Sequence, residues 1–340
     1  MLMHWLLAGM AVLAVAARPR SWRSALLAAT AATLDVALQG AAAVPAALRV
    51  ALPTFGFLAL AVGLAGWAVR VGAVQVTAGA LARAADGRPW RLFGLVCCLT
   101  AALTAVVSLD GAVVVMAPVV VELRRRLGAP VRPLLLGVVA VANGFSLAVP
   151  EGNPTNLVVV QHLGLSIADT VTRTAAPAVA ATVVCAGAVA WRERRSLGGA
   201  AQEREPQPAV PRLASGLAGV ARVGVQVTAL LVCLLPLAAG TRFAAGSGLG
   251  PLVAVSLVTA AAAAIANNLP ASAVVASWLA PGPAAYAAIV GLSVGALATP
   301  QGSVATLIAG DLAGSEPYTR ALAPAAAASV LAATLLVWVT

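Results

Sequence analysis

Two stretches of this sequence decide its fold: PEGNPTNLV (residues 150–158) and PQGSVATLI (residues 300–308). Each interrupts a long apolar run with proline, glycine and small polar residues, and they align at an offset of 150 residues. In lipid an unpaired backbone group is costly, so a helix breaks there only where the break lines a cavity inside the protein. Paired breaks of this kind are typical of binding sites in secondary transporters. The sequence therefore predicts two broken helices, 133–163 and 284–312, facing a shared polar cavity.

The composition places the chain in a membrane. Of 340 residues, 61% are hydrophobic and only 9% are charged, whereas about a quarter of the residues of a soluble domain are charged. With about 20 apolar residues per crossing, this content allows about ten apolar segments. The long Ala, Leu and Val runs also lack the alternation of a membrane β-strand. We predict an all-α, multi-pass protein of the cell (cytoplasmic) membrane with about eight full spans.

The charge distribution predicts the orientation. All 21 basic residues are arginines, and with 11 acidic residues they give a formal charge of +10. The arginines lie between the apolar runs, which is how multi-pass proteins mark their cytoplasmic loops, and they form no patch with aromatic residues. We therefore expect no nucleic-acid partner. The loops predicted to be cytoplasmic are 18–23, 70–91, 124–132 and 192–212.

Two further interruptions predict re-entrant hairpins. Residues 92–121 turn near Asp110 and have arginines on both flanks, whereas residues 251–279 turn near Asn267 and have almost no charge around them. The first hairpin should therefore open to the cytoplasm and the second to the outside. We predict two inverted repeats, with both termini outside. The first is 1–191, the cytoplasmic linker is 192–212, and the second, shortened repeat is 213–340, with one span before its hairpin where the first has three.

The four interruptions carry amides and hydroxyls but no arginine, which favours a small polar solute or ion. Helix N-termini attract anions and C-terminal carbonyls attract cations, so the breaks alone allow either. The candidate binding residues are Asp110, Gly111, Asn143, Glu151, Gly152, Asn153, Thr155, Asn156, Asn267, Asn268, Pro270, Thr299, Pro300, Gln301, Gly302, Ser303 and Thr306.

Three acidic residues fall within the predicted spans. An ionised carboxylate is costly in the membrane and is usually functional there. Asp110 and Glu151 are the candidates for proton coupling, with a hydrogen-bonded strut as the alternative for each. Asp35 has no helix break around it, so either role is open. Arg173 and Arg222 lie near predicted helix ends, and we expect them to extend toward the interface.

The sequence predicts no enzyme activity, no metal centre and no cofactor. The segment GLSVG (residues 291–295) fits the G-x-S-x-G pattern of serine hydrolases, but that motif requires a strand-to-helix turn and a histidine partner. We interpret it as small residues at a helix contact. The four cysteines have no metal-binding spacing, and we expect them to be small buried hydrophobic residues.

Four ordered motifs together resemble the arsenite permease (ArsB-type) branch of the ion-transporter superfamily, which also holds NhaD-type sodium/proton antiporters and divalent-anion/sodium symporters. The motifs are SLDGAVVVMAPVVVEL (108–123), ANGFSLAVPEGNPTNLV (142–158), NNLP (267–270) and TPQGSVATL (299–307).

The resemblance implies an inverted-repeat carrier, a homodimer that moves its transport domain across the bilayer. Its cargo would be arsenite or antimonite exported against proton entry, in some members with a cytoplasmic ATPase as partner. The alternatives are a sodium/proton antiporter or a carrier of a small (di)carboxylate or inorganic anion on the same fold. A more distant alternative is a membrane scaffold that transports nothing.

Overall fold

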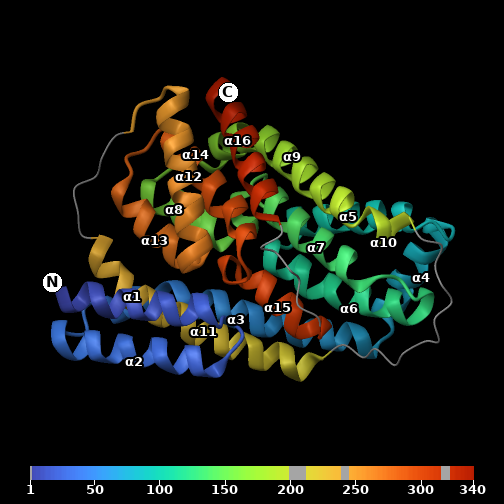
Figure 1. Cartoon of the computed structure of the whole chain (residues 1–340), viewed down its shortest axis with the longest axis horizontal. Coiled ribbons are helices and arrows are strands. Elements are labelled where there is room, and N and C mark those ends of the chain that lie inside the picture. Colours follow the sequence, from blue (N-terminus) through green and yellow to red (C-terminus); the bar gives the residue numbers. More distant parts are fainter. Residues whose placement is uncertain (1, 199–211, 239–244, 315–321) are drawn as a thin grey trace.

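The computed structural model describes residues 2–198, 212–238, 245–314 and 322–340, and every regular element in these ranges is a helix (Figure 1). This confirms the predicted all-α fold. The α-helices are α1 (Leu2–Ala17), α2 (Trp22–Gln39), α3 (Ala43–Arg70), α4 (Ala73–Ala85), α5 (Pro89–Val106), α6 (Leu109–Leu127), α7 (Val131–Phe145), α8 (Pro154–Leu163), α9 (Ile167–Arg192), α10 (Arg194–Gly198), α11 (Leu213–Leu234), α12 (Leu249–Ala266), α13 (Asn268–Trp278), α14 (Pro283–Gly295), α15 (Val304–Ala313) and α16 (Ala323–Val339). Short 3-10 turns are η1 (Pro150–Gly152), η2 (Leu235–Ala238), η3 (Ala296–Ala298) and η4 (Pro300–Gly302).

Several helices are suited to a bilayer. Within the described ranges, five are long and apolar enough to cross one: α3, α5, α9, α11 with its η2 extension, and α12. Helices α1, α7, α14, α15 and α16 are shorter but also apolar. Large apolar side chains such as Leu60 and Val106 lie exposed on the surface, where lipid would surround them. The chain is a multi-pass membrane protein.

The helices break where the sequence predicts. Helices α5 and α6 are separated at Val107 and Ser108, α12 and α13 at Asn267, and both broken helices are interrupted at their 3-10 turns. Helix α6 of the first hairpin packs on α15, and α13 of the second hairpin packs on α8. Each hairpin thus contacts the broken helix of the other half. The repeat boundaries and their inverted orientation stay predictions.

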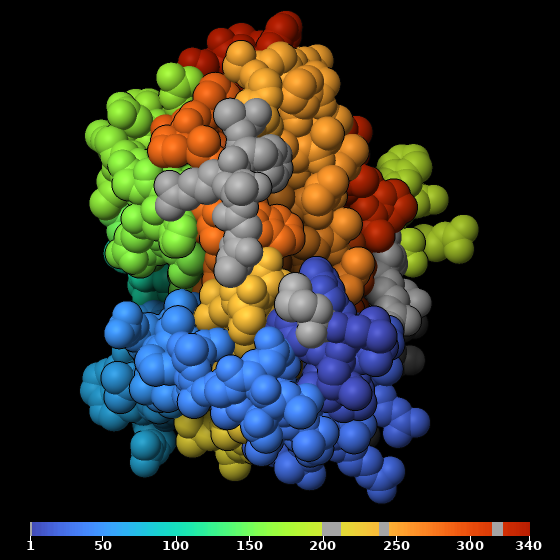
Figure 2. Space-filling model, turned by 90° about the vertical axis from the view of Figure 1, so that its left-hand side faces the viewer, coloured from blue at the N-terminus to red at the C-terminus, as the bar shows by residue number. Residues whose placement is uncertain are grey.

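Helices α1, α2, α3 and α11 form a layer that we call the wall, along the lower edge of Figure 1. Figure 2 shows the blue helices of the wall beneath the orange and green remainder of the protein. Although α11 follows the first half in sequence, it packs between α2 and α3, and it also contacts α13 and α15. Helix α11 therefore reaches both α15, which follows the second break, and α13 of the second hairpin.

One predicted loop contains a helix. Residues 70–91 were expected to be an arginine-rich loop, but α4 occupies their middle. Its buried residues Val74, Ala78, Leu81 and Ala85 recur at helical spacing, and this amphipathic pattern outweighs the flanking arginines. In the predicted linker 192–212, Arg192 is the last residue of α9, and α10 (Arg194–Gly198) follows it. Residues 199–211 of this linker lie outside the described ranges.

Candidate functional site

The N-termini of four helices meet around one small cavity. Apart from Thr54 of α3, every lining residue is the N-cap residue or one of the first two residues of α6, α8, α13 or α15. The cavity has room for about one water molecule. Its lining residues are Thr54, Leu109, Asp110, Asn153, Pro154, Thr155, Asn268, Leu269, Ser303 and Val304. All four interruptions identified in the sequence therefore converge.

The electrostatics of this cavity favour an anion beside a protonatable group. The unpaired amides at a helix N-terminus carry about half a positive charge, and four such ends point here. Among the described lining residues none is arginine or lysine. Asp110 is 4% exposed, and its carboxylate has no ion-pair partner in the described ranges. A buried carboxylate without a counterion is costly while it is ionised, so binding a proton or a cation there is favourable.

In the first break the two asparagines are fully engaged. Asn153 caps α8, because its Oδ1 accepts from the Thr155 amide at 3.0 Å, while its Nδ2 donates to the hydroxyls of Ser146 and Ser293 at 3.1 and 3.3 Å. Asn156 donates to the Ser146 carbonyl at 3.0 Å and accepts from the Ser293 hydroxyl at 2.7 Å. Ser293 of α14 thus holds both amides of the opposite half.

In the second hairpin an asparagine also caps a helix. Asn267 Oδ1 accepts from the Leu269 amide at 3.1 Å, and its Nδ2 donates to the Gln301 carbonyl at 2.7 Å. The Gln301 side chain donates to the Ala264 carbonyl at 3.0 Å, and the Thr299 hydroxyl donates to the same oxygen. The C-terminal end of α12 is therefore tied to the break between α14 and α15.

Several polar atoms of the second half have no hydrogen-bond partner within the described ranges. The hydroxyl oxygens of Ser303 and Thr306 and the Oε1 of Gln301 are buried without a hydrogen bond in the described structure. The same holds for Asn143 Oδ1 in the first half. Buried polar groups are almost always paired in folded proteins, so these atoms are free for a ligand or water. Ser303 lies directly at the cavity.

A family model of citrate transporters (CitMHS) matches residues 10–239, more than half of the chain. The chain belongs to the citrate transporter family. It is therefore a secondary transporter of the ion-transporter type, in the superfamily that its motifs indicate. The arsenite branch that the motifs resemble is not the one matched. A comparison with curated proteins finds no match.

The match to the citrate transporters includes two of the four helix N-termini. Helices α6 and α8 lie within residues 10–239, whereas α13 and α15 follow them.

The structure brings some of the predicted binding residues to the cavity and keeps others behind it. Lining it are Asp110, Asn153, Thr155, Asn268 and Ser303. Buried but outside the lining are Gly111, Asn143, Gly152, Asn156, Asn267, Pro270, Gln301, Gly302 and Thr306. Thr299 and Pro300 are half-buried.

Glu151 departs most from expectation. Its side chain is exposed, while its neighbours Pro150 and Gly152 are buried. The 3-10 turn η1 directs these two residues inward and Glu151 outward. The structure therefore does not bring Glu151 to the cavity or to Asp110.

The arginine prediction was wrong for Arg222. Its side chain is 6% exposed within α11 and pairs with Asp311 at 2.8 Å, so it does not extend to an interface. Asp311 was missed because it ends an apolar run. The other intramembrane acid, Asp35, pairs with His4 at 2.6 Å and joins α1 to α2, which fits the strut reading.

The GLSVG segment packs as interpreted. A Cβ placed on Gly291 would lie 2.2 Å from the Ser256 carbonyl, and one on Gly295 would lie 2.4 Å from the Ala260 Cα. These glycines let α14 approach α12 closely. The serine between them, Ser293, also bonds Asn153 and Asn156, a role that the sequence analysis did not find. A lone serine inside a buried apolar helix was the available signal.

Proposed function

We propose that this transporter moves a small carboxylate anion of the citrate type, coupled to a proton or cation that binds at Asp110. One observation carries the proposal: four helix N-termini converge on one buried cavity. Backbone amides at helix N-termini bind carboxylates and phosphates without a basic side chain. The match to citrate transporters supports the same class of substrate.

Asp110 suits the coupling role through its position. Its carboxylate would repel an anion in the same cavity, and a bound proton or Na⁺ removes that repulsion. Substrate and coupling ion would then bind together and favour each other. We prefer the proton, because among the described residues near the cavity Asp110 is a lone carboxylate and Na⁺ usually needs several oxygen ligands.

A transport assay tests this function. Purified protein in proteoliposomes should take up labelled citrate or a dicarboxylate when a proton gradient is imposed. Replacing that gradient with a sodium gradient distinguishes the two coupling ions. Uptake that ignores both gradients would contradict the coupling.

Arsenite or antimonite is the second candidate. Arsenite is an uncharged trihydroxide at neutral pH, and the hydroxyls and amides around the cavity suit it. A thermal-shift series with citrate, succinate, arsenite, antimonite and sodium at two pH values separates the candidates. A ligand at 100 times its Kd stabilises the folded protein by about 2.7 kcal/mol. Stabilisation by arsenite alone would favour export of arsenite, and no stabilisation by any ligand would favour a scaffold.

The cellular setting also stays a proposal. We propose the cytoplasmic membrane as the location and a homodimer as the assembly. A cytoplasmic ATPase would have to meet the linker 192–212, most of which lies outside the described residues. Cross-linking in native membranes, followed by mass determination, tests both partners.

A further inference from the structure

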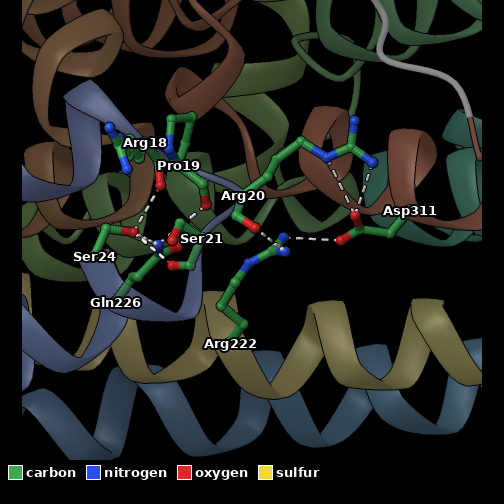
Figure 3. A network of polar contacts seen from close by, with 8 residues as sticks. All are labelled: Arg18, Pro19, Arg20, Ser21, Ser24, Arg222, Gln226 and Asp311. Atoms are coloured by element: carbon green, nitrogen blue, oxygen red, sulfur yellow. Dashed lines mark hydrogen bonds and ion pairs between the residues drawn. The ribbon is translucent and has the colours of Figure 1, made fainter.

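A buried ionic bridge joins helix α15 to the wall (Figure 3). Asp311 Oδ1 accepts from Arg20 Nε and Nη2 at 3.2 and 3.0 Å, and Oδ2 accepts from Arg222 Nη2 at 2.8 Å. Arg222 Nη1 also donates to the Arg20 carbonyl at 2.9 Å. Three segments therefore meet in one closed set of contacts: the α1–α2 connection, α11 and α15.

The bridge is buried and closely fitted. Asp311 is 8% exposed, and its carboxylate pairs with both arginines. A Cβ on Gly219 would lie 2.2 Å from Asp311 Oδ2, and one on Gly216 would lie 2.5 Å from Leu312 Cδ2. The Arg212 amide donates to the Leu312 carbonyl at 3.0 Å. Helix α11 thus holds the last turn of α15 at close range.

The wall has its own fastening nearby. Gln226, about one turn along α11 from Arg222, donates to the Pro19 carbonyl at 3.1 Å and to the Ser24 hydroxyl at 2.8 Å. These contacts join α11 to the α1–α2 connection and involve no residue of α15. The wall is therefore held together without Asp311, and the distinctive contribution of the bridge is to α15.

Helix α15 joins this bridge to the binding cavity. Ser303, its N-cap residue, lines the cavity, and Asp311 lies eight residues later in the same helix. At 1.5 Å per residue the two are about 12 Å apart along the axis. A ten-residue helix is rigid over that length, so its axial position at Asp311 fixes the position of its N-terminus.

We propose that Arg20, Asp311 and Arg222 are positioning residues that hold α15 so that its N-terminal amides and Ser303 face the anion. The proposal rests on the proposed function. None of the three lines the cavity, so weakening the bridge should lower affinity through the position of α15.

Two substitutions in one connection give a matched test. Arg20→Gln removes half of the bridge, whereas Arg18→Gln removes the same charge two residues away, from an exposed side chain that does not bond Asp311 in the described structure. Gln226→Ala weakens the wall without touching α15. Asp311→Asn is the stronger variant. If Asp311→Asn fails to fold, Arg20→Gln still gives a usable test, because Arg20→Gln leaves the buried Arg222 paired with Asp311.

Citrate Kd is measured by calorimetry, and amide hydrogen exchange of residues 307–310 is measured without ligand. We expect Arg20→Gln to raise Kd by about fivefold or more, a typical size for coupling between sites, and to speed exchange in α15. Arg18→Gln and Gln226→Ala should change neither. Equal effects of Arg20→Gln and Arg18→Gln would overturn the proposal. A loss of citrate affinity that simply follows the fall in melting temperature across all variants would also overturn it. If the wild type binds no citrate, the proposed function fails, while the exchange comparison still tests the bridge.

Discussion

The two helix breaks align with each other in the sequence but differ in how their polar groups are used. Asn153 and Asn156 in the first break are fully hydrogen-bonded, to their own helix and to Ser146 and Ser293. At the positions 150 residues later stand Ser303 and Thr306, whose buried hydroxyls have no hydrogen-bond partner among the residues that the structure describes. We call Asn153 and Asn156 the fixed frame. We call Ser303 and Thr306, whose hydroxyls can still bond a ligand, the open surface.

The difference lies in which helix is capped. The Asn153 amide caps α8 while it also bonds the two serines. A serine hydroxyl can cap a helix too, as Ser108 does at α6, but Ser303 makes no cap bond to α15. The amides of α15 at the cavity are therefore left uncovered, and we expect them to provide the specific contacts to the anion.

The largest effect should come from the carboxylate between the two breaks. Asp110→Asn removes the proposed site for the coupling ion, so gradient-driven uptake should fall to background. Folding should be retained, because Asp110 has no ion pair to lose in the described structure. Proteoliposome uptake and a melting curve measure the two. Full uptake in this variant would remove Asp110 from the mechanism.

A substitution in the fixed frame should lower the stability of the folded protein. Asn153→Ala removes a helix cap and the two hydrogen bonds to the buried hydroxyls of Ser146 and Ser293, which together cost about 2 to 4 kcal/mol of folding free energy. Unfolding in mixed micelles measures this loss. Thr155→Ala is the control, because Thr155 bonds Asn153 through its backbone amide. An equal loss in both variants would show that the cap is not what matters.

A substitution in the open surface should weaken binding of the anion. Ser303→Ala removes a hydroxyl that bonds nothing in the described structure, so stability should change little, whereas citrate Kd should rise by about tenfold, as expected for a hydrogen bond to a charged ligand. Calorimetry measures the affinity. If Ser303→Ala lowers stability as much as Asn153→Ala while leaving Kd unchanged, the contrast between the breaks is wrong.

The smallest effect is expected at Glu151. Because its side chain is exposed and away from the cavity, Glu151→Gln should leave the uptake rate and its pH profile unchanged. Asp110→Asn in the same assay is the reference. A lost pH dependence in Glu151→Gln would return this carboxylate to the coupling site, where the sequence analysis had placed it.

The sequence predicted what depends on local chemistry. Prolines, glycines and amides mark the breaks, and these were found without the structure. The sequence could not predict contacts that depend on how distant segments pack: Arg222 and Asp311 are 89 residues apart, and Asn156 and Ser293 are 137 apart. Nor could it predict which way Glu151 faces, since one residue in a 3-10 turn decides that.

The narrowness of the cavity has a consequence for substrate entry. A space for about one water molecule is far smaller than a citrate ion. Under the proposed function, the four helix N-termini around the cavity therefore have to move apart before such an anion can bind among their amides.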